Sequence, residues 1–234
     1  MSFQDEIQKR FTHWEASRME PTTGKWREKR RLAFALRAVI ERLVVSDAPE
    51  DELARAADAL ERYATQLEAH PRSGKYEGFA EAGPAGDTAA FFDQSPIIGL
   101  SNPLSPPVVV QADPENRRVT GEVTFGSAYE GPPGCVHGGW VAAAFDEILG
   151  YANSLSGSPG MTARLTVNYR QPTPLLTPLR FEAQLDRVEG RKIFVTGQVY
   201  ARDQLTAEAD GLFVSVDPEK FRGLMEKRQA LQNP

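Results

Sequence analysis

Cysteine and histidine are scarce in this sequence: 234 residues contain one cysteine, Cys135, and three histidines. A single cysteine excludes a disulfide framework within the chain and is typical of a protein kept in a reducing cytoplasm. The cysteine and histidines do not have the spacing of a structural zinc site, so no metal is expected. We therefore expect a cytoplasmic protein without a metal centre.

Long apolar runs and excess positive charge are also missing. No run of eighteen apolar residues occurs, so no membrane span is expected. The first twenty residues mix charges where a secretory signal would have an apolar centre. The formal net charge of −5 argues against a chain-wide basic surface for nucleic acid. With 41% hydrophobic and 25% charged residues, the composition is that of a soluble globular protein.

Two amphipathic helices are predicted near the N-terminus. Residues 27–45 and 50–69 both carry apolar residues at helical spacing. The stretch Ser46–Pro49 between them stops one helix and starts the next. Together with a short helix predicted over 3–16, they suggest that residues 1–70 form an N-terminal helical region containing an antiparallel hairpin.

Composition changes after this region. Residues 71–90 are rich in Gly, Pro and Ala and read as a linker. Residues 91–107 are apolar but interrupted by four prolines, so they should pack without forming long elements. A main domain is expected over 91–217, and a helical tail over 218–234.

The main domain switches to a period of two, which is typical of strands. Strands are expected at 107–112, 118–125, 162–170, 179–188, 191–202 and 205–216. Between the second and third lies a helical stretch, 138–153, which is apolar on nearly every face and so suits a helix wrapped by a sheet. The expected fold class is therefore α+β: a mostly antiparallel sheet curled around one helix, with hairpin-like connections among the last four strands.

The start of this central helix carries the candidate chemistry. Gly138 and Gly139 would let a ligand approach the backbone closely. The first N–H groups of a helix lack intrahelical partners, and the helix dipole favours negative charge in front of them. An oxyanion forming at a thioester carbonyl would be stabilised there.

Asp146 and Glu147 are the only acids of an otherwise apolar helix. Glu147 suits a helix-surface acid, whereas Asp146 is the candidate carboxylate, because an acid on a helix that is expected to be buried needs a reason. It lies eight residues after Gly138, or about 12 Å along the helix axis. The two cannot act on one small group within a single chain. They could if two helices pack antiparallel across a twofold axis, so the pattern implies a homodimer with shared active sites.

Three segments carry a resemblance to a known family: HGGWVAAAFDEILG, MTARLTVNYRQPTPL and LDRVEGRKIFVTG, in this order. They resemble hotdog-fold acyl-CoA thioesterases, in the branch of the phenylacetyl-CoA thioesterases and the carboxyl-terminal modulator protein. The resemblance covers residues 91–217 and not the N-terminal helices. It implies a hotdog fold, acyl-CoA as substrate, no cofactor beyond the CoA of that substrate, and a homodimer or dimer of dimers.

The resemblance also assigns residues. Asp146 matches the family's nucleophile or general base, Gly138 the N–H donor to the thioester carbonyl, and His137 the histidine before it. Thr162 matches a hydroxyl that helps place the attacking water. Gly139 is expected to contact substrate, and the resemblance suggests that basic residues face the CoA phosphates: Arg170, Arg187, Arg191 and Lys192.

One position departs from the pattern of other branches. They have an asparagine six residues before the histidine, where this chain has Gly131. Its polar contact is therefore missing or comes from elsewhere, for example from Glu130 or Tyr129.

Other interpretations remain open on sequence grounds. A hotdog hydratase acting on enoyl-CoA could use His137 and Asp146 as a paired acid and base, and a non-catalytic acyl-CoA-binding module is a third possibility. Cys135 has no dedicated base and reads as a packing residue rather than a nucleophile. The N-terminal hairpin could be a packing or oligomer appendage, or a lid over the acyl pocket.

Overall fold

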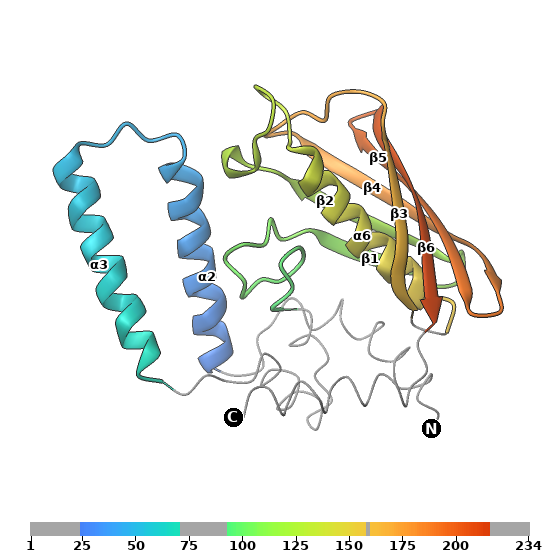
Figure 1. The fold of residues 1–234 in the computed structure, drawn as a ribbon, viewed down its shortest axis with the longest axis horizontal. Coiled ribbons are helices and arrows are strands. Elements are labelled where there is room, and N and C mark those ends of the chain that lie inside the picture. The colour runs from blue at the N-terminus through green and yellow to red at the C-terminus, as the bar shows by residue number, and fades with distance from the viewer. Residues whose placement is uncertain (1–23, 71–92, 158–159, 216–234) are drawn as a thin grey trace.

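The computed structural model describes residues 24–70, 93–157 and 160–215. The helix expected over 3–16, the linker 71–90 and the tail 218–234 lie outside these residues. Within them, one curved sheet packs on a central helix, and two further helices lie on the side where the sheet ends in its first strand (Figure 1).

All six expected strands are present, and all neighbouring pairs are antiparallel. Their order across the sheet is β1-β2-β4-β5-β6-β3. Their bounds are β1 Val109–Asp113, β2 Arg118–Thr124, β3 Gly160–Tyr169, β4 Pro178–Glu189, β5 Lys192–Ala201 and β6 Gln204–Ser215.

One expected connection was wrong. The turns from β4 to β5 and from β5 to β6 are hairpins, and Gly190 takes the positive φ that its tight turn requires. Strand β3, however, pairs with β6 and not with β4. The chain after β3 crosses to the middle of the sheet through residues 170–177. Local periodicity cannot reveal this, because it marks strands and not their partners.

The central helix α6, Gly138–Ser154, forms the core with the inner face of the sheet. Its largest buried side chains include Phe145, Ile148 and Leu149. The helix approaches the sheet closely over glycine: a Cβ on Gly197 would stand 2.9 Å from a Leu149 methyl carbon. Small residues under the helix let large helix side chains fill the space at native density.

A segment without regular structure, residues 93–107, covers part of the helix and is called the strap here. Ile97 and Ile98 are buried in the core, and the Val108 N–H donates to the Ile97 carbonyl just before β1. The four prolines of this part of the sequence thus end up in a packed but irregular segment, as expected.

Helix α2, Gly24–Leu43, is attached to the strap and to the short 3-10 helix η1, Ser127–Tyr129. Arg30 forms an ion pair with the buried Asp93 at 3.0 Å. Arg37 donates to the Leu100 and Asn102 carbonyls. These are side-chain contacts from one face of the helix, and they hold it against the main domain.

Glu41, near the end of α2, caps η1. Its carboxylate accepts from the Ser127 N–H at 2.7 Å and the Ala128 N–H at 3.1 Å. The pKa of Glu41 is lowered: burial raises it, but these hydrogen bonds to the charged form outweigh that effect.

Helix α3, Glu50–Glu68, follows α2, but the expected hairpin is open. Every residue of α3 is exposed, and the apolar residues of the two helices do not bury one another. Among the described helices, none combines the length and apolar character that crossing a membrane requires.

Candidate active site

The first turn of α6 is shaped by His137, its N-cap. The His137 Nδ1 accepts from the Gly139 N–H at 3.0 Å, and the His137 N–H donates to the Tyr129 carbonyl at 2.9 Å. The Gly139 N–H is therefore used inside the cap, which is a structural use of a residue expected to contact substrate. His137 orders the start of the helix.

Gly138 is the first residue of α6. In the described part of the chain its N–H has no acceptor, as expected for an N-terminal helix position. Its carbonyl accepts from the Tyr169 hydroxyl at 2.7 Å. A Cβ at Gly138 would stand 3.2 Å from that hydroxyl, so the aromatic ring and the glycine are matched in shape. This corner offers one free donor at the positive end of a helix.

Asp146 and Thr162 are brought together. The Thr162 hydroxyl donates to the Asp146 carboxylate at 2.8 Å, from β3 to α6. Asp146 is exposed in the protomer, which corrects the expectation that it is buried. This hydrogen bond fixes one carboxylate oxygen, and the other accepts no hydrogen bond from the residues that the structure describes, so it is available to accept a proton or to attack.

A β-bulge sets this contact. Thr162 pairs with Phe213 and Arg164 with Leu212, so Ala163 is an extra residue in β3. Phe213 faces the helix, and so therefore does Thr162. After the bulge the phase has shifted by one residue, and Leu165 and the odd-numbered positions face the helix. If β3 paired regularly from Leu165 onward with Ala163 opposite Phe213, Thr162 would stand opposite Val214 and point away from Asp146.

Glu147, the other acid of α6, is largely buried, whereas Asp146 is exposed. Glu147, which could have been a simple surface acid, lies under the strap and accepts from the Ser95 hydroxyl at 3.4 Å. Burial, the largest cause, raises the pKa of Glu147 to about 7; the charge of Asp146 adds to this and the Ser95 hydrogen bond opposes it. The sequence gives no signal for this, because it depends on where the strap lies.

The basic residues divide between two ends of the sheet. Lys192 is the first residue of β5, and Arg191 precedes it in the turn. Both lie at the end of the sheet where β3 begins, near Thr162, because Lys192 pairs with Val214 and Val214 with Met161. Arg191 donates to the Ser215 carbonyl at 3.0 Å.

Arg170 follows Tyr169, at the opposite end of β3, and is paired with Glu208. Arg187 binds Glu189 at 2.6 Å and lies over the Phe194 ring. Both arginines are thus already paired within the chain. Arg191 and Lys192 have no carboxylate partner among the described residues, and they share the Asp146 end of the sheet.

At position 131, where other branches have asparagine, the backbone of His137 occupies the space that a side chain would need. A Cβ at Gly131 would lie 2.8 Å from the His137 Cα, so a larger residue does not fit there. Glu130 accepts from the Gly134 N–H at 2.6 Å, and the Tyr129 hydroxyl donates to the Leu104 carbonyl at 3.2 Å. Neither suggested substitute is therefore free to supply the asparagine's contact.

Three further residues of the central region have packing contacts. Trp140 meets the Tyr129 ring edge-on at 4.9 Å, and Phe145 is buried against Phe181. The Cys135 thiol lies near the Pro133 carbonyl at 3.6 Å. No base contacts the thiol among the described residues, as the packing interpretation of Cys135 expects.

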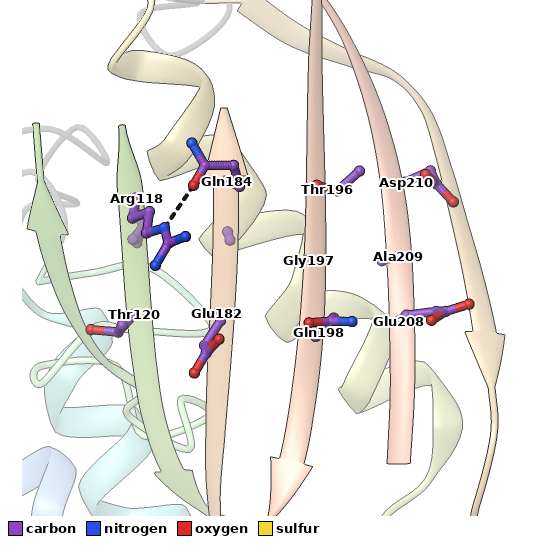
Figure 2. Close-up of a pocket in the computed structure, with 12 residues that line it drawn as sticks. Arg118, Thr120, Glu182, Gln184, Thr196, Gly197, Gln198, Glu208, Ala209 and Asp210 are labelled. Atoms are coloured by element: carbon purple, nitrogen blue, oxygen red, sulfur yellow. Dashed lines mark hydrogen bonds between the residues drawn. The ribbon is translucent and has the colours of Figure 1, made fainter. Parts of the chain in front are cut away.

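A groove of about 590 Å³ lies on the outer face of the sheet, away from α6. Figure 2 shows its polar lining, with Arg118 bonded to Gln184 on one side and Glu208 and Asp210 on the other. The groove contains neither Asp146, Thr162 nor Gly138, so it is separate from the candidate site.

Sequence reasoning missed two positions that shape the candidate site: Tyr169, which bonds to the Gly138 carbonyl, and Ala163, the extra residue of the bulge in β3. Tyr169 closes a strand and gives no local signal, and a bulge is invisible in a period-two pattern when small residues surround it. The quoted segment MTARLTVNY does contain both, but neither is a residue of obvious chemistry.

Comparison with known proteins gives concordant matches. The family model "Thioesterase superfamily" matches residues 133–208. The chain is 36% identical over 124 residues to acyl-coenzyme A thioesterase THEM4 of Bos taurus, covering 52% of this chain and 51% of the relative. It is 41% identical over 93 residues to the THEM4 protein of Mus musculus, covering 39% and 40%. The chain thus spans about half the length of the curated relatives it matches.

One solved structure matches more of the chain. A crystal structure of a thioesterase superfamily protein is 35% identical, with a TM-score of 0.69, and the match covers 83% of this chain and 96% of that one. Such a match exceeds what residues 71–234 could supply. Part of the N-terminal helical region is therefore shared with that protein.

Proposed function

The chain belongs to the thioesterase superfamily and has its hotdog fold, and from this premise we propose that it hydrolyses acyl-CoA to the free acid and CoA. The observation that carries the proposal is the exposed Asp146 carboxylate, bonded to the Thr162 hydroxyl at 2.8 Å. An aligned carboxylate open to solvent on an otherwise apolar helix is suited to catalysis rather than to packing.

In this proposal the Gly138 N–H, at the positive end of α6, stabilises the oxyanion of the tetrahedral species. Asp146 either removes a proton from water or attacks the carbonyl to give a mixed anhydride. Thr162 orients the carboxylate and helps to hold the water. His137 and Tyr169 position Gly138 through the cap and the carbonyl hydrogen bond.

We propose further that each site is shared between two copies. Asp146 and Gly138 are about 12 Å apart along one helix, too far to act on one carbonyl. Strand β3 is an edge strand with exposed side chains, and antiparallel pairing of two such edges would bring the Thr162 end of one chain to the Tyr169 end of the other. A homodimer, or a dimer of dimers, follows from this arrangement.

Arg191 and Lys192 are the proposed contacts for the CoA phosphates, because they lie at the Asp146 end without a carboxylate partner. Arg170 joins them only if it exchanges Glu208 for a phosphate. We propose no cofactor besides the CoA of the substrate, and a cytoplasmic location on the basis of cysteine usage. The hydratase alternative is not favoured, because the Nδ1 atom of His137 is used to cap the helix.

The test is release of the CoA thiol from a panel of acyl-CoA substrates. Asp146→Asn should lower kcat by about a hundredfold or more while preserving the fold. The chain supplies a matched control in Asp186, another exposed carboxylate bonded to a threonine hydroxyl, from Thr196 at 3.1 Å. Asp186→Asn should leave turnover unchanged.

Two results would refute the proposal. One is equal turnover by the parent and Asp146→Asn. The other is a parent that binds acyl-CoA tightly without releasing thiol, which would favour a binding module. Hydration of crotonyl-CoA without thiol release would instead support the hydratase.

A further inference from the structure

The N-terminal helices expose two apolar stripes. In α2 the stripe is Leu32, Leu36, Val39 and Leu43; in α3 it is Leu53, Ala57, Leu60, Ala64 and Leu67. The spacings alternate between three and four residues, which is the pattern of helices that pack side by side. The large residues of these stripes, with Tyr63, are 36% to 55% exposed, apart from the half-buried Leu36. Within the described ranges, no element covers either stripe.

The stripe on α2 is not the face that holds this helix to the main domain. The docking face consists of Trp26, Arg30, Ala33, Arg37 and Glu41. At 3.6 residues per turn, the stripe lies about a third of the way around the helix from it. The helix is therefore already anchored and still presents a second, apolar face. In Figure 1, α3 lies beside α2 and farther from the sheet.

The net charges of α2 and α3 indicate what covers the two stripes. Helix α2 has seven basic and two acidic residues, a net charge of +5, whereas α3 has six acidic and two basic residues, a net charge of −4. A lipid surface would suit α2 but would be repelled by α3. A second copy of the chain fits both helices. Its acidic α3 can face the basic α2 of the first copy, and its basic α2 can face the acidic α3 of the first.

We propose that the α2–α3 pair is an interface between two copies of this chain, in which α3 of one copy packs its stripe on α2 of the other. The helices have 20 and 19 residues, about 30 Å each, so the pairs match in length. The contact is isologous, as a twofold axis requires. It forms a four-helix cluster with apolar stripes inside and opposite charges along its seams.

This interface is separate from the β3 edge. Helix α2 contacts η1 and the strap, whereas β3 stands at the far edge of the sheet from β1. If both interfaces form, two dimers joined by their helices give a tetramer. The helical interface does not depend on the catalytic proposal, because no residue of the stripes touches Asp146, Thr162 or Gly138 in the described structure.

The experiment measures the mass of the full-length protein in solution by size exclusion with light scattering. The double variant Leu60→Glu/Leu67→Glu places two charges in the α3 stripe and should halve the mass of the parent. The matched control, Ala54→Glu/Thr65→Glu, adds the same charges to the same helix away from the stripe and should keep the parental mass. Thiol release per site should be the same in all three proteins.

Three outcomes overturn the proposal. In the first, the stripe variant keeps the parental mass. In the second, the control variant and the stripe variant lose mass equally. In the third, parent and stripe variant have the same mass, but only the parent binds anionic vesicles. If the stripe variant does not fold, Leu60→Cys in a Cys135→Ser background answers the same question with a bismaleimide reagent. A covalent product of twice the chain mass supports the interface, and its absence overturns it.

Discussion

Replacing Glu147 by glutamine should stabilise the protein at alkaline pH and not at acidic pH. Glu147 lies beneath the strap, and its pKa is raised from 4.5 to about 7, mainly by burial. The folded state therefore holds a proton that the unfolded state has already released between these two pH values. The free energy of unfolding must fall as pH rises through this window.

The size of the effect follows from the shift. At about 1.4 kcal/mol per pKa unit, the charged carboxylate costs the folded state about 3 kcal/mol above pH 7. Glutamine keeps the shape and can still bond to the Ser95 hydroxyl, but it has no proton to lose. The variant should gain about 3 kcal/mol on the parent at pH 8, and this advantage should disappear towards pH 4.5.

The assay is chemical denaturation of both proteins from pH 5 to pH 8 at one protomer concentration, because association shifts apparent stability. Glu115→Gln, at an exposed position between β1 and β2, is the control for the loss of one negative charge. A difference between Glu147→Gln and the parent that does not change with pH would refute the reasoning, and so would a variant that is less stable at pH 8.

Three other changes have expected outcomes. Asp93→Ala should cost about 3 kcal/mol in denaturation experiments, because it leaves the largely buried Arg30 without its carboxylate; a cost below 1 kcal/mol would contradict this. Phe145→Ala should cost about 3–5 kcal/mol by opening a cavity in the core, again by denaturation; an unchanged midpoint would show that the core is not packed as described. Thr162→Val removes the hydroxyl that bonds to Asp146 and should lower kcat about tenfold with little change in KM, whereas unchanged kinetics would contradict a role for this bond.

Much of the fold could be predicted from local pattern. Each strand and the helix at 138–153 ended within about two residues of expectation, because alternation and helical spacing report directly on which side chains face a core. The pairing of β3 with β6 could not, since it is set by tertiary packing around α6. The open arrangement of α2 and α3 was missed for a similar reason: two complementary stripes predict a partner without saying which chain supplies it.

For the candidate site, the sequence indicated some of the residues that lie together, and their catalytic roles stay predictions. The resemblance singled out Asp146 and Thr162, and the structure brings them within hydrogen-bonding distance. It gave no means of ranking burial, so Asp146 was expected inside while Glu147 is the acid under the strap. Tyr169 stayed hidden because its role depends on the crossing between a strand end and a helix start.

The attachment of α2 has a consequence for sequence change in this protein. Arg37 binds the carbonyls of Leu100 and Asn102, and Glu41 binds two backbone N–H groups of η1. Every residue offers such a carbonyl, and every residue except proline offers such an N–H group. At most of these bonded positions, a substitution can therefore change the side chain without removing the backbone group that holds α2. Mutation or protein engineering can thus vary the side chains of the strap and η1 while α2 stays attached.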